Sequence, residues 1–449
     1  MIPPTLLSRP FEPANGEDAF LRWALAQPNA VFIDSGDKSF SSLRWAPSST
    51  KRFDTLQAGE LDAWLGPASQ VSGVKAESDV PSWHLPGPVV FAGYEAAHFF
   101  EPELPAFQSD GLTLPVLWAA RFDWSLVRTP QRNWTLLWRE GCQIPQEFGS
   151  VEEGQTPPTS LPELRAHWSE AEYRDAFAKT MAHIREGVFY EANLTQAFSA
   201  EGEFDAVEIY LRLRRASKPN WGAFVDLGQE QKLLSSSPEC FLRSDGGEIV
   251  TEPIKGTRPR GLNAAEDRAL IEELSASLKE HAELTMVVDM LRNDLARVSH
   301  AGSVKVPAHA QVVTLPHVHH LVSEVRATLK SETSFESLLR ATFPGGSITG
   351  APKFSVIKEQ SQIECLRRGP YTGSLFALGA DGALASNILI RTIAIDGQTL
   401  RFHTGGGIVA DSQVDAEYLE CFHKARGIAQ ALGQSVNVRL IQAKLDSGP

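Results

Sequence analysis

One lysine in this chain of 449 residues is placed where an amine could react. Lys255 lies in TEPIKGTRPRG, residues 251–261, between a Pro-Ile pair and a Gly-Thr turn, with Arg258 and Arg260 close behind. The stretch is either a basic surface turn or a reactive amine held beside an anion-binding turn. A free lysine, with a pKa of about 10.4, is almost wholly protonated at neutral pH. Reactivity therefore depends on what the fold places around Lys255.

Glu239 is the acid that could work with this lysine. The two belong to LLSSSPECFLRSDGGEIVTEPIKG, residues 233–256, where two β-type runs flank an Asp-Gly-Gly turn. If that turn is a three-residue loop, Ser244 pairs with Glu248, and Lys255 lies diagonal to Glu239 on one face, about 7–8 Å away. A loop longer by one residue would put them on opposite faces. A solvated ion pair is the commoner meaning of such a pattern.

Two pairs of glutamates have the spacing of metal ligands. Glu280 and Glu283 lie three residues apart in a helical pattern, as do Glu417 and Glu420 near the C-terminus. Residues at this spacing share one helix face, where like charges are mildly destabilising. Four carboxylates would suit Mg²⁺, but only if the fold brings the two pairs together. Either pair by itself is equally well a solvated helix face.

Two glycine-rich stretches could bring backbone amides close to a ligand. FPGGSITGAPK, residues 343–353, has two glycines at phosphate-loop spacing but continues Ala-Pro-Lys, so we exclude a nucleotide-binding loop. HTGGGIVADS, residues 403–412, places three glycines after a strand. These glycines either offer amides at close range or form a bulge or tight turn.

A cluster of three histidines is the remaining candidate for acid–base chemistry. His317, His319 and His320 lie in PHVHHLVSEV, with no cysteines or spaced carboxylates around them. A metal cluster is therefore less well supported than a single histidine that faces a site as acid or base. We expect one or two of the three to serve packing.

The elements that must position these groups alternate between hairpins and helices. Short strands are predicted in PNAVFIDSG, GPVVFAGYE and RNWTLLWRE, a helix from about Ser169 to Glu186, and one long helical stretch over 264–298. Residues 374–407 predict a three-strand meander with Asp-Gly at both turns. Antiparallel hairpins with intervening helices indicate an α+β fold.

Composition excludes several classes of protein. The net charge of −13 argues against a nucleic-acid partner. No apolar run approaches 18 residues and no basic start precedes an apolar stretch, so we expect neither a membrane span nor a signal peptide. Four scattered cysteines, without a pairing pattern, fit a reducing compartment. We therefore expect a cytoplasmic protein. The cysteines are Cys142, Cys240, Cys365 and Cys421.

Taken together, the motifs resemble the chorismate-binding enzyme family. The resemblance rests on SPECFLR, EPIKGTRPRG, EHAELTMVVDMLRNDLARV, HHLVSEV, ATFPGGSITGAPK, GPYTGSLF, ILIRT and TGGGIVADSQVDAEYLECFHKA, which occur in order between about residues 165 and 430. It is looser before residue 140. It implies an α+β fold of antiparallel sheets packed around a buried active site, with helices outside. The expected parts are an N-terminal β-rich part over 1–140, a linker or surface insertion over 141–164 and a catalytic core over 165–437.

The resemblance also implies a role for each site residue. The four glutamates would hold Mg²⁺, which would bridge to the ring carboxylate of chorismate. Substrate-binding residues carried over from the motifs are Ser347, Thr349, Tyr371, Arg391, Gly405, Gly407 and Lys424. The catalytic residues would be Lys255, Glu239 and His320.

Two positions indicate which branch of the family is closest. PIKGT, with Lys255, resembles the branch that forms aminodeoxychorismate, whereas the anthranilate-forming branch has alanine at this position. FYEANLTQAF resembles the ammonia-using pattern, but Glu191 replaces the usual glutamine, which could alter the handling of ammonia. The implied mechanism is attack of Lys255 at C2, protonation of the C4 hydroxyl by Glu239, and displacement of the lysine by ammonia at C4. The product would serve 4-aminobenzoate and folate biosynthesis.

The source of ammonia should be another protein. The chain has no Gly-x-Cys-x-Gly motif, so we expect a separate glutamine amidotransferase subunit as partner. FIDSG differs from the motif of tryptophan-inhibited relatives, which argues against feedback control by tryptophan. The alternatives are an anthranilate-forming enzyme and a catalytically silent chorismate-binding subunit.

Overall fold

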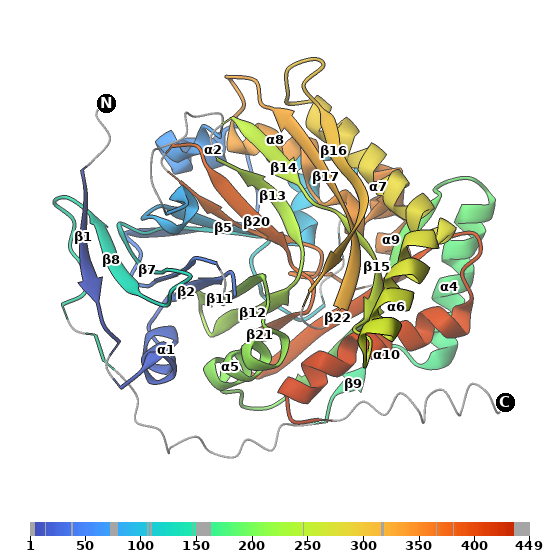
Figure 1. Cartoon of the computed structure of the whole chain (residues 1–449), viewed down its shortest axis with the longest axis horizontal. Coiled ribbons are helices and arrows are strands. Elements are labelled where there is room, and N and C mark those ends of the chain that lie inside the picture. The colour runs from blue at the N-terminus through green and yellow to red at the C-terminus, as the bar shows by residue number, and fades with distance from the viewer. Residues whose placement is uncertain are drawn as a thin grey trace.

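Two antiparallel β-sheets form the centre of the molecule (Figure 1). The computed structural model describes residues 5–434 except 14, 37–38, 72–79, 106, 108–109, 147, 150–162, 246, 316–317, 365 and 380. Within these residues the first sheet has twelve strands. In spatial order they are β1 (Leu6–Phe11), β8 (Trp134–Arg139), β7 (Trp124–Arg128), β3 (Ser41–Arg44), β2 (Val31–Asp34), β11 (Trp221–Gly228), β12 (Gln231–Ser237), β21 (Thr392–Asp396), β22 (Thr399–Ile408), β10 (Glu191–Glu201) and β18 (Gly350–Ala351), with β9 (Arg165–Ala166) also on β10.

The second sheet has ten strands in the described residues. They are β15 (Ile254–Pro259), β17 (Val318–Thr328), β14 (Glu248–Thr251), β13 (Cys240–Ser244), β20 (Leu384–Ile388), β19 (Ser374–Leu378), β5 (Pro88–Ala92), β6 (Leu117–Arg121) and β4 (Ser49–Phe53), with β16 (Lys305–Thr314) also on β17. Each sheet contains strands from before and after residues 141–164, because β2 pairs with β11 and β5 pairs with β19. The N-terminal strands are thus continuous with the strands that carry the motifs.

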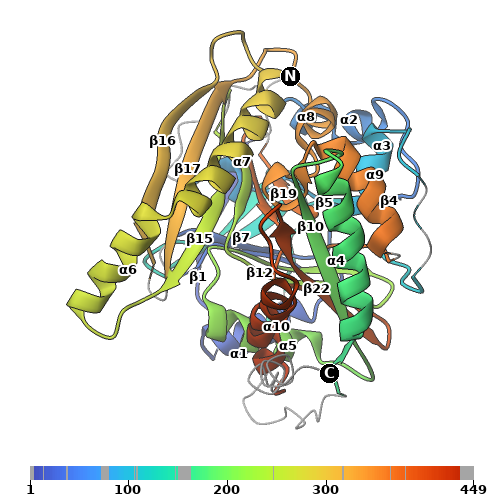
Figure 2. The same cartoon turned by 90° about the vertical axis from the view of Figure 1, so that its right-hand side faces the viewer.

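Helices cover the outer faces of both sheets. They are α1 (Glu17–Leu25), α2 (Glu60–Leu65), α3 (Ala97–Phe100), α4 (Glu170–Arg185), α5 (Ala206–Ser217), α6 (Ala264–Ala276), α7 (Leu278–Ala296), α8 (Phe335–Thr342), α9 (Lys353–Glu364) and α10 (Val414–Ala431). Apolar side chains from the two sheets, such as Val31, Trp118, Val225 and Leu375, pack in one core between them. A second core lies under α1, α4, α5 and α10, and a third under α2, α3, α7 and α8. Figure 2 shows α6 and α7 along β15–β17, and α4 and α9 beside β10.

The α+β class predicted from the sequence is confirmed, as is the helix over α4. Ser169 caps α4 in a capping box with Glu172, which is why the helix begins there. None of the helices in the described part of the chain has the length and apolar composition that a membrane crossing requires.

The single long helix expected over 264–298 is wrong, because the chain forms two helices with a break at Ser277. That residue has an extended backbone, and its side chain caps α7 by accepting from the backbone of Glu280. The signal was present in the sequence as Ser-Leu-Lys-Glu, a capping pattern. Glu280 and Glu283 therefore lie in the first two turns of α7.

The three-strand meander over 374–407 is also wrong. Both Asp-Gly turns close hairpins, but β19 and β20 belong to the second sheet and β21 and β22 to the first. The chain crosses between the sheets at Leu389–Arg391, where Arg391 has a φ of 51°. A local pattern fixes each hairpin, whereas the sheet that each hairpin joins depends on distant strands.

Candidate active site

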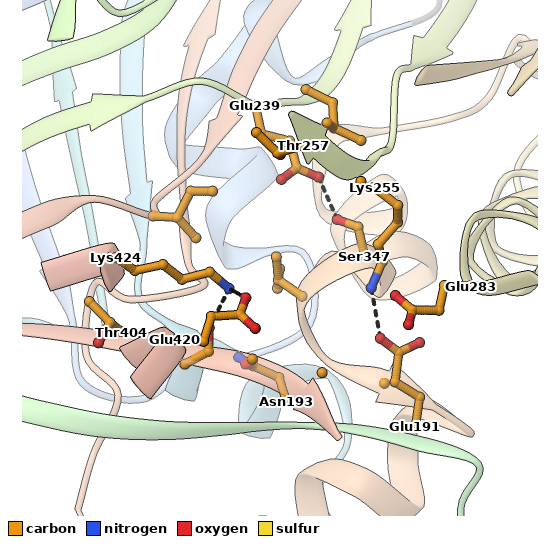
Figure 3. A pocket seen from close by; sticks show the side chains of 18 of the residues that line it. Glu191, Asn193, Glu239, Lys255, Thr257, Glu283, Ser347, Thr404, Glu420 and Lys424 are labelled. Atoms are coloured by element: carbon orange, nitrogen blue, oxygen red, sulfur yellow. Dashed lines mark hydrogen bonds and ion pairs between the residues drawn. The ribbon is translucent and has the colours of Figure 1, made fainter. Parts of the chain in front are cut away.

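A cavity of about 460 Å³ lies where β10, β15, β22, α7 and α10 meet (Figure 3). Every candidate residue chosen from the sequence lines it, although those residues lie up to 185 positions apart in the chain (239 to 424). They are Glu239, Lys255, Glu280, Glu283, His320, Ser347, Thr349, Tyr371, Arg391, Gly405, Gly407, Glu417, Glu420 and Lys424. The fold thus gathers these residues; their individual roles remain predictions.

Lys255 is held in a buried ion pair on one wall of the cavity. Its Nζ lies 2.7 Å from Oε1 of Glu191, the first residue of β10, and the two side chains are 15% and 5% exposed. Burial by itself would lower the pKa of Lys255, but the charge and hydrogen bond of Glu191 outweigh it, and the pKa is raised. In this geometry the amine is therefore an ammonium group. Figure 3 shows Glu191 and Glu283 on the same side of Lys255.

Glu239 lies between β12 and β13 and is almost fully buried. Its Oε1 accepts a hydrogen bond of 2.7 Å from Oγ of Ser347, which belongs to a short 3₁₀ turn. Burial raises the pKa of Glu239 to about 7, against the opposing effects of Ser347, Lys255 and Lys424. A carboxylic acid with this pKa is partly protonated at neutral pH and can donate a proton.

The hairpin register predicted for these two residues is wrong. Ser244 pairs with Ile249, so the loop is one residue longer than expected. The strands stay paired for only two residues of each, after which β15 pairs with β17, with Lys255 opposite Leu321. Glu239 and Lys255 therefore line the same cavity because β15 pairs with β17. The short hairpin between the two residues does not place them side by side.

The three glycines after the predicted strand lie inside β22, so of the two alternatives the turn or bulge is the one that is not formed. A Cβ on Gly407 would lie 2.4 Å from Oε1 of Glu191, and one on Gly406 would lie 2.8 Å from Oε2 of Glu417. One on Gly405 would meet the backbone of β10 at 2.3 Å. Glycine is needed because carboxylates and a neighbouring strand approach the backbone closely.

The histidines divide as expected into one that faces the cavity and one that packs. Nδ1 of His320 lies 3.0 Å from Oγ1 of Thr257, and burial lowers the pKa of His320, which favours its neutral form. His319 is fully buried, with Nε2 2.9 Å from Oδ1 of Asp267. His317 lies outside the described residues.

The two glutamate pairs lie on α7 and α10 and line the same cavity. Glu280 and Glu283 are 21% and 18% exposed and lie 3.6 Å from Arg258 and 3.9 Å from Lys279, respectively. Burial raises the pKa values of Glu283 and Glu417, against the opposing effects of Lys255 on Glu283 and of Ser412 on Glu417, and neighbouring acidic groups add to the rise. Glu417 also accepts a 2.8 Å hydrogen bond from Ser412. The cavity is thus rich in carboxylates whose charge is only partly compensated.

Cationic groups line the cavity from other elements. Nζ of Lys424 donates to the carbonyl oxygen of Gly405 and pairs with Glu420, each at 2.7 Å. The guanidinium of Arg391, on the link between the two sheets, makes no hydrogen bond or ion pair with any residue that the structure describes. A cation without such a partner, facing a cavity, is suited to an anionic ligand.

Several lining residues were missed as site residues by the sequence reasoning. Asn193 donates to the hydroxyl of Tyr371 at 3.5 Å, and His403 stacks on the same ring with centroids 5.7 Å apart. Both nitrogens of His403 are buried without a hydrogen-bond partner in the described residues. The signals were available, since Asn193 lies in NLTQ and His403 begins HTGGG. Glu191 was noticed only as a departure, because nothing local pairs it with Lys255.

The arrangement suits covalent catalysis on an anionic substrate. It combines a buried amine, an acid with a pKa near neutrality, free positive charge and four hard oxygen donors within one cavity.

Comparisons with known proteins point to one family. Residues 28–430 match the family described as chorismate binding enzyme. Aminodeoxychorismate synthase component 1 of Klebsiella aerogenes is 36% identical over 454 residues, which cover 96% of this chain and 100% of that protein. The protein of the same name from Escherichia coli is 38% identical over 345 residues, covering 76% and 75%. The structure of anthranilate synthase component I from Streptococcus pneumoniae has a TM-score of 0.74 and 25% identity, covering 87% of this chain and 92% of that chain.

Proposed function

This chain belongs to the family of chorismate binding enzymes, and from that premise we propose that it converts chorismate and ammonia into 4-amino-4-deoxychorismate. The observation that carries the proposal is Lys255, a buried amine in the cavity that also contains Glu239. Two relatives, matched over 100% and 75% of their length, are named for this activity.

Lys255 is the nucleophile of the proposed reaction and Glu239 its general acid. The amine attacks C2 of the chorismate ring while the Glu239 carboxyl protonates the departing C4 hydroxyl, which leaves as water. Ammonia then adds at C4 and expels the lysine, which frees the enzyme. A pKa of about 7 suits Glu239 to this role, because a large fraction of the acid form is present at neutral pH. His320, neutral and close to Thr257, orients neighbouring groups.

The substrate is a dianion, and the cations of the cavity suit it. Arg391 and Lys424 would bind carboxylate oxygens, with Tyr371, Ser347 and Thr349 completing the polar wall. Gly405 and Gly407 line the cavity and would offer backbone groups to the ligand. An acidic protein can bind an anionic substrate through such local groups.

Mg²⁺ is the cation that the two glutamate pairs suit in donor type. Burial raises the pKa values of Glu283 and Glu417, and nearby carboxylates (Glu191 and Glu280 for Glu283, Glu420 for Glu417) raise them further, so a cation between α7 and α10 would relieve repulsion. Within the described residues no three acidic, imidazole or thiol groups lie close enough to share one ion. Water and substrate oxygens would therefore complete the coordination shell. When bound, the ion would supply positive charge to the substrate carboxylate.

The ammonia would come from a separate glutamine amidotransferase subunit. Both relatives are named as component 1 of their enzyme, which supports a multi-subunit enzyme. The product would then be consumed in 4-aminobenzoate and folate synthesis in the cytoplasm.

The test is turnover of chorismate with Mg²⁺ and an ammonium salt, with products identified by mass. The wild-type protein should form aminodeoxychorismate, and Lys255→Ala should lose most of this activity while it still binds chorismate. Release of pyruvate and anthranilate would instead indicate an anthranilate synthase, the activity named for the Streptococcus pneumoniae protein. No turnover, with the amidotransferase partner present as well, would indicate a silent binding subunit.

A further inference from the structure

We propose that Glu191 is the catalytic base that takes a proton from the Lys255 ammonium group before attack and returns it when the lysine is released. This inference rests on the proposed function and deepens it. The reason for a base is simple: the nitrogen of an ammonium group has no lone pair, so the protonated lysine of this structure cannot attack a carbon atom.

The geometry suits direct proton transfer. Oε1 of Glu191 lies 2.7 Å from Nζ of Lys255, a distance typical of a charge-assisted hydrogen bond. The Glu191 side chain is only 5% exposed, so bulk water competes little for the proton.

The backbone holds Glu191 from two sides. It pairs with Ala351 of β18, and the next residue of β10 pairs with Ile408 of β22. Both neighbouring strands have a glycine where contact is closest: a Cβ on Gly407 would meet Oε1 at 2.4 Å, and one on Gly350 would meet the Glu191 carbonyl oxygen at 2.1 Å. The backbone of Glu191 is thus fixed between two strands, and its carboxylate packs closely against Gly407.

The other acidic groups around Lys255 are less suited to this task. Glu239 and Glu283 act on Lys255 through charge, but within the described residues only Glu191 forms an ion pair with its amine. Glu239 accepts from Ser347 and serves as the acid, and Glu283 lies on α7 near Lys279. Separate groups would therefore serve as base and acid in the first step.

The proton balance closes over one turnover. Glu191 takes one proton from the ammonium group, and the uncharged amine forms the N–C2 bond while the C4–O bond breaks with a proton from Glu239. The adduct nitrogen then carries two protons and a positive charge. When ammonia forms the C4–N bond, the C2–N bond breaks and releases Lys255 as an uncharged amine. The protonated Glu191 returns its proton to that amine, and Glu239 is reprotonated from solvent.

The test follows formation of the lysine adduct with chorismate and Mg²⁺ in the absence of ammonia, by intact-protein mass in rapid-quench samples. Glu191→Gln keeps the size of the side chain and removes its basicity. We expect adduct formation to slow by about 100-fold or more, the usual effect of a general base, with chorismate binding within a few-fold of wild type. Glu201→Gln is the matched control, since Glu201 ends the same strand on the surface, and it should form the adduct at the wild-type rate.

A second variant separates a chemical role from a structural one. Glu191→Ala leaves a space beside Gly407 that a small carboxylate could enter, so added formate should accelerate adduct formation while an equal concentration of chloride should not. Adduct formation by Glu191→Gln at the wild-type rate or faster, or the lack of any formate effect on Glu191→Ala, would overturn the proposal. Absence of an adduct in the wild-type protein would overturn the proposed function itself, and this inference with it.

Discussion

Removal of the Ser347 hydroxyl should raise the pH above which Glu239, the proposed general acid, loses its proton. Ser347 donates to Glu239 at 2.7 Å and stabilises the carboxylate, which opposes the burial that raises the pKa to about 7. Ser347→Ala removes that donor and leaves the burial in place. The pKa of Glu239 should therefore rise further, and the proposed acid should stay protonated to higher pH.

The size of the shift can be worked from the hydrogen bond. A hydrogen bond to a charged group contributes about 1.5–3 kcal/mol, and one pKa unit corresponds to about 1.36 kcal/mol, so the pKa should rise by about 1–2. In the wild-type protein, a pKa of about 7 leaves about nine tenths of Glu239 protonated at pH 6 and about one tenth at pH 8. In the variant, about half or more should still be protonated at pH 8.

The assay is kcat/KM for chorismate against pH, with saturating Mg²⁺ and a constant concentration of uncharged ammonia. The readout is the position of the basic limb, since loss of a polar wall residue could also lower the rate at every pH. Ser412→Ala is the matched control, because Ser412 donates to another cavity glutamate, Glu417, at 2.8 Å. A basic limb that stays in place in Ser347→Ala, or moves to lower pH, would refute the assignment of Glu239 as the acid.

Two further predictions follow from the packing and charge of the cavity. Gly407→Ala should abolish most chorismate turnover, because its Cβ would lie 2.4 Å from Oε1 of Glu191. The control Gly427→Ala, on α10 with nothing within 4 Å of its Cβ, should keep full turnover and raise the free energy of unfolding by about 0.5–1 kcal/mol. Turnover and urea unfolding of both variants check this, and an active Gly407→Ala would contradict the packing argument. Glu283→Gln should raise the Mg²⁺ concentration that gives the half-maximal rate by about tenfold or more, because it removes one charged ligand from the proposed site. If a titration of the rate with Mg²⁺ matches that of the wild type, Glu283 is excluded as a ligand.

Local patterns in the sequence determined the elements and the chemistry available to them. Ser169 with Glu172 fixed the start of α4, and the two Asp-Gly turns closed their hairpins, because capping and tight turns depend on residues only a few positions apart. The order of motifs identified the residues that line the cavity and the α+β class.

Only the tertiary structure decided how those parts meet. The paths of β15 along β17 and of β21 into the first sheet depend on strands far away in the chain, and a shift of one residue reverses the face of a strand. For this reason the hairpin register of Glu239 and Lys255 could not be read from their spacing. The ion pair between Lys255 and Glu191 is likewise non-local: its two residues are 64 positions apart and come from different sheets. The sequence identified Lys255 as the candidate reactive amine, whereas the packing of the two sheets places Glu191, the proposed base, beside it.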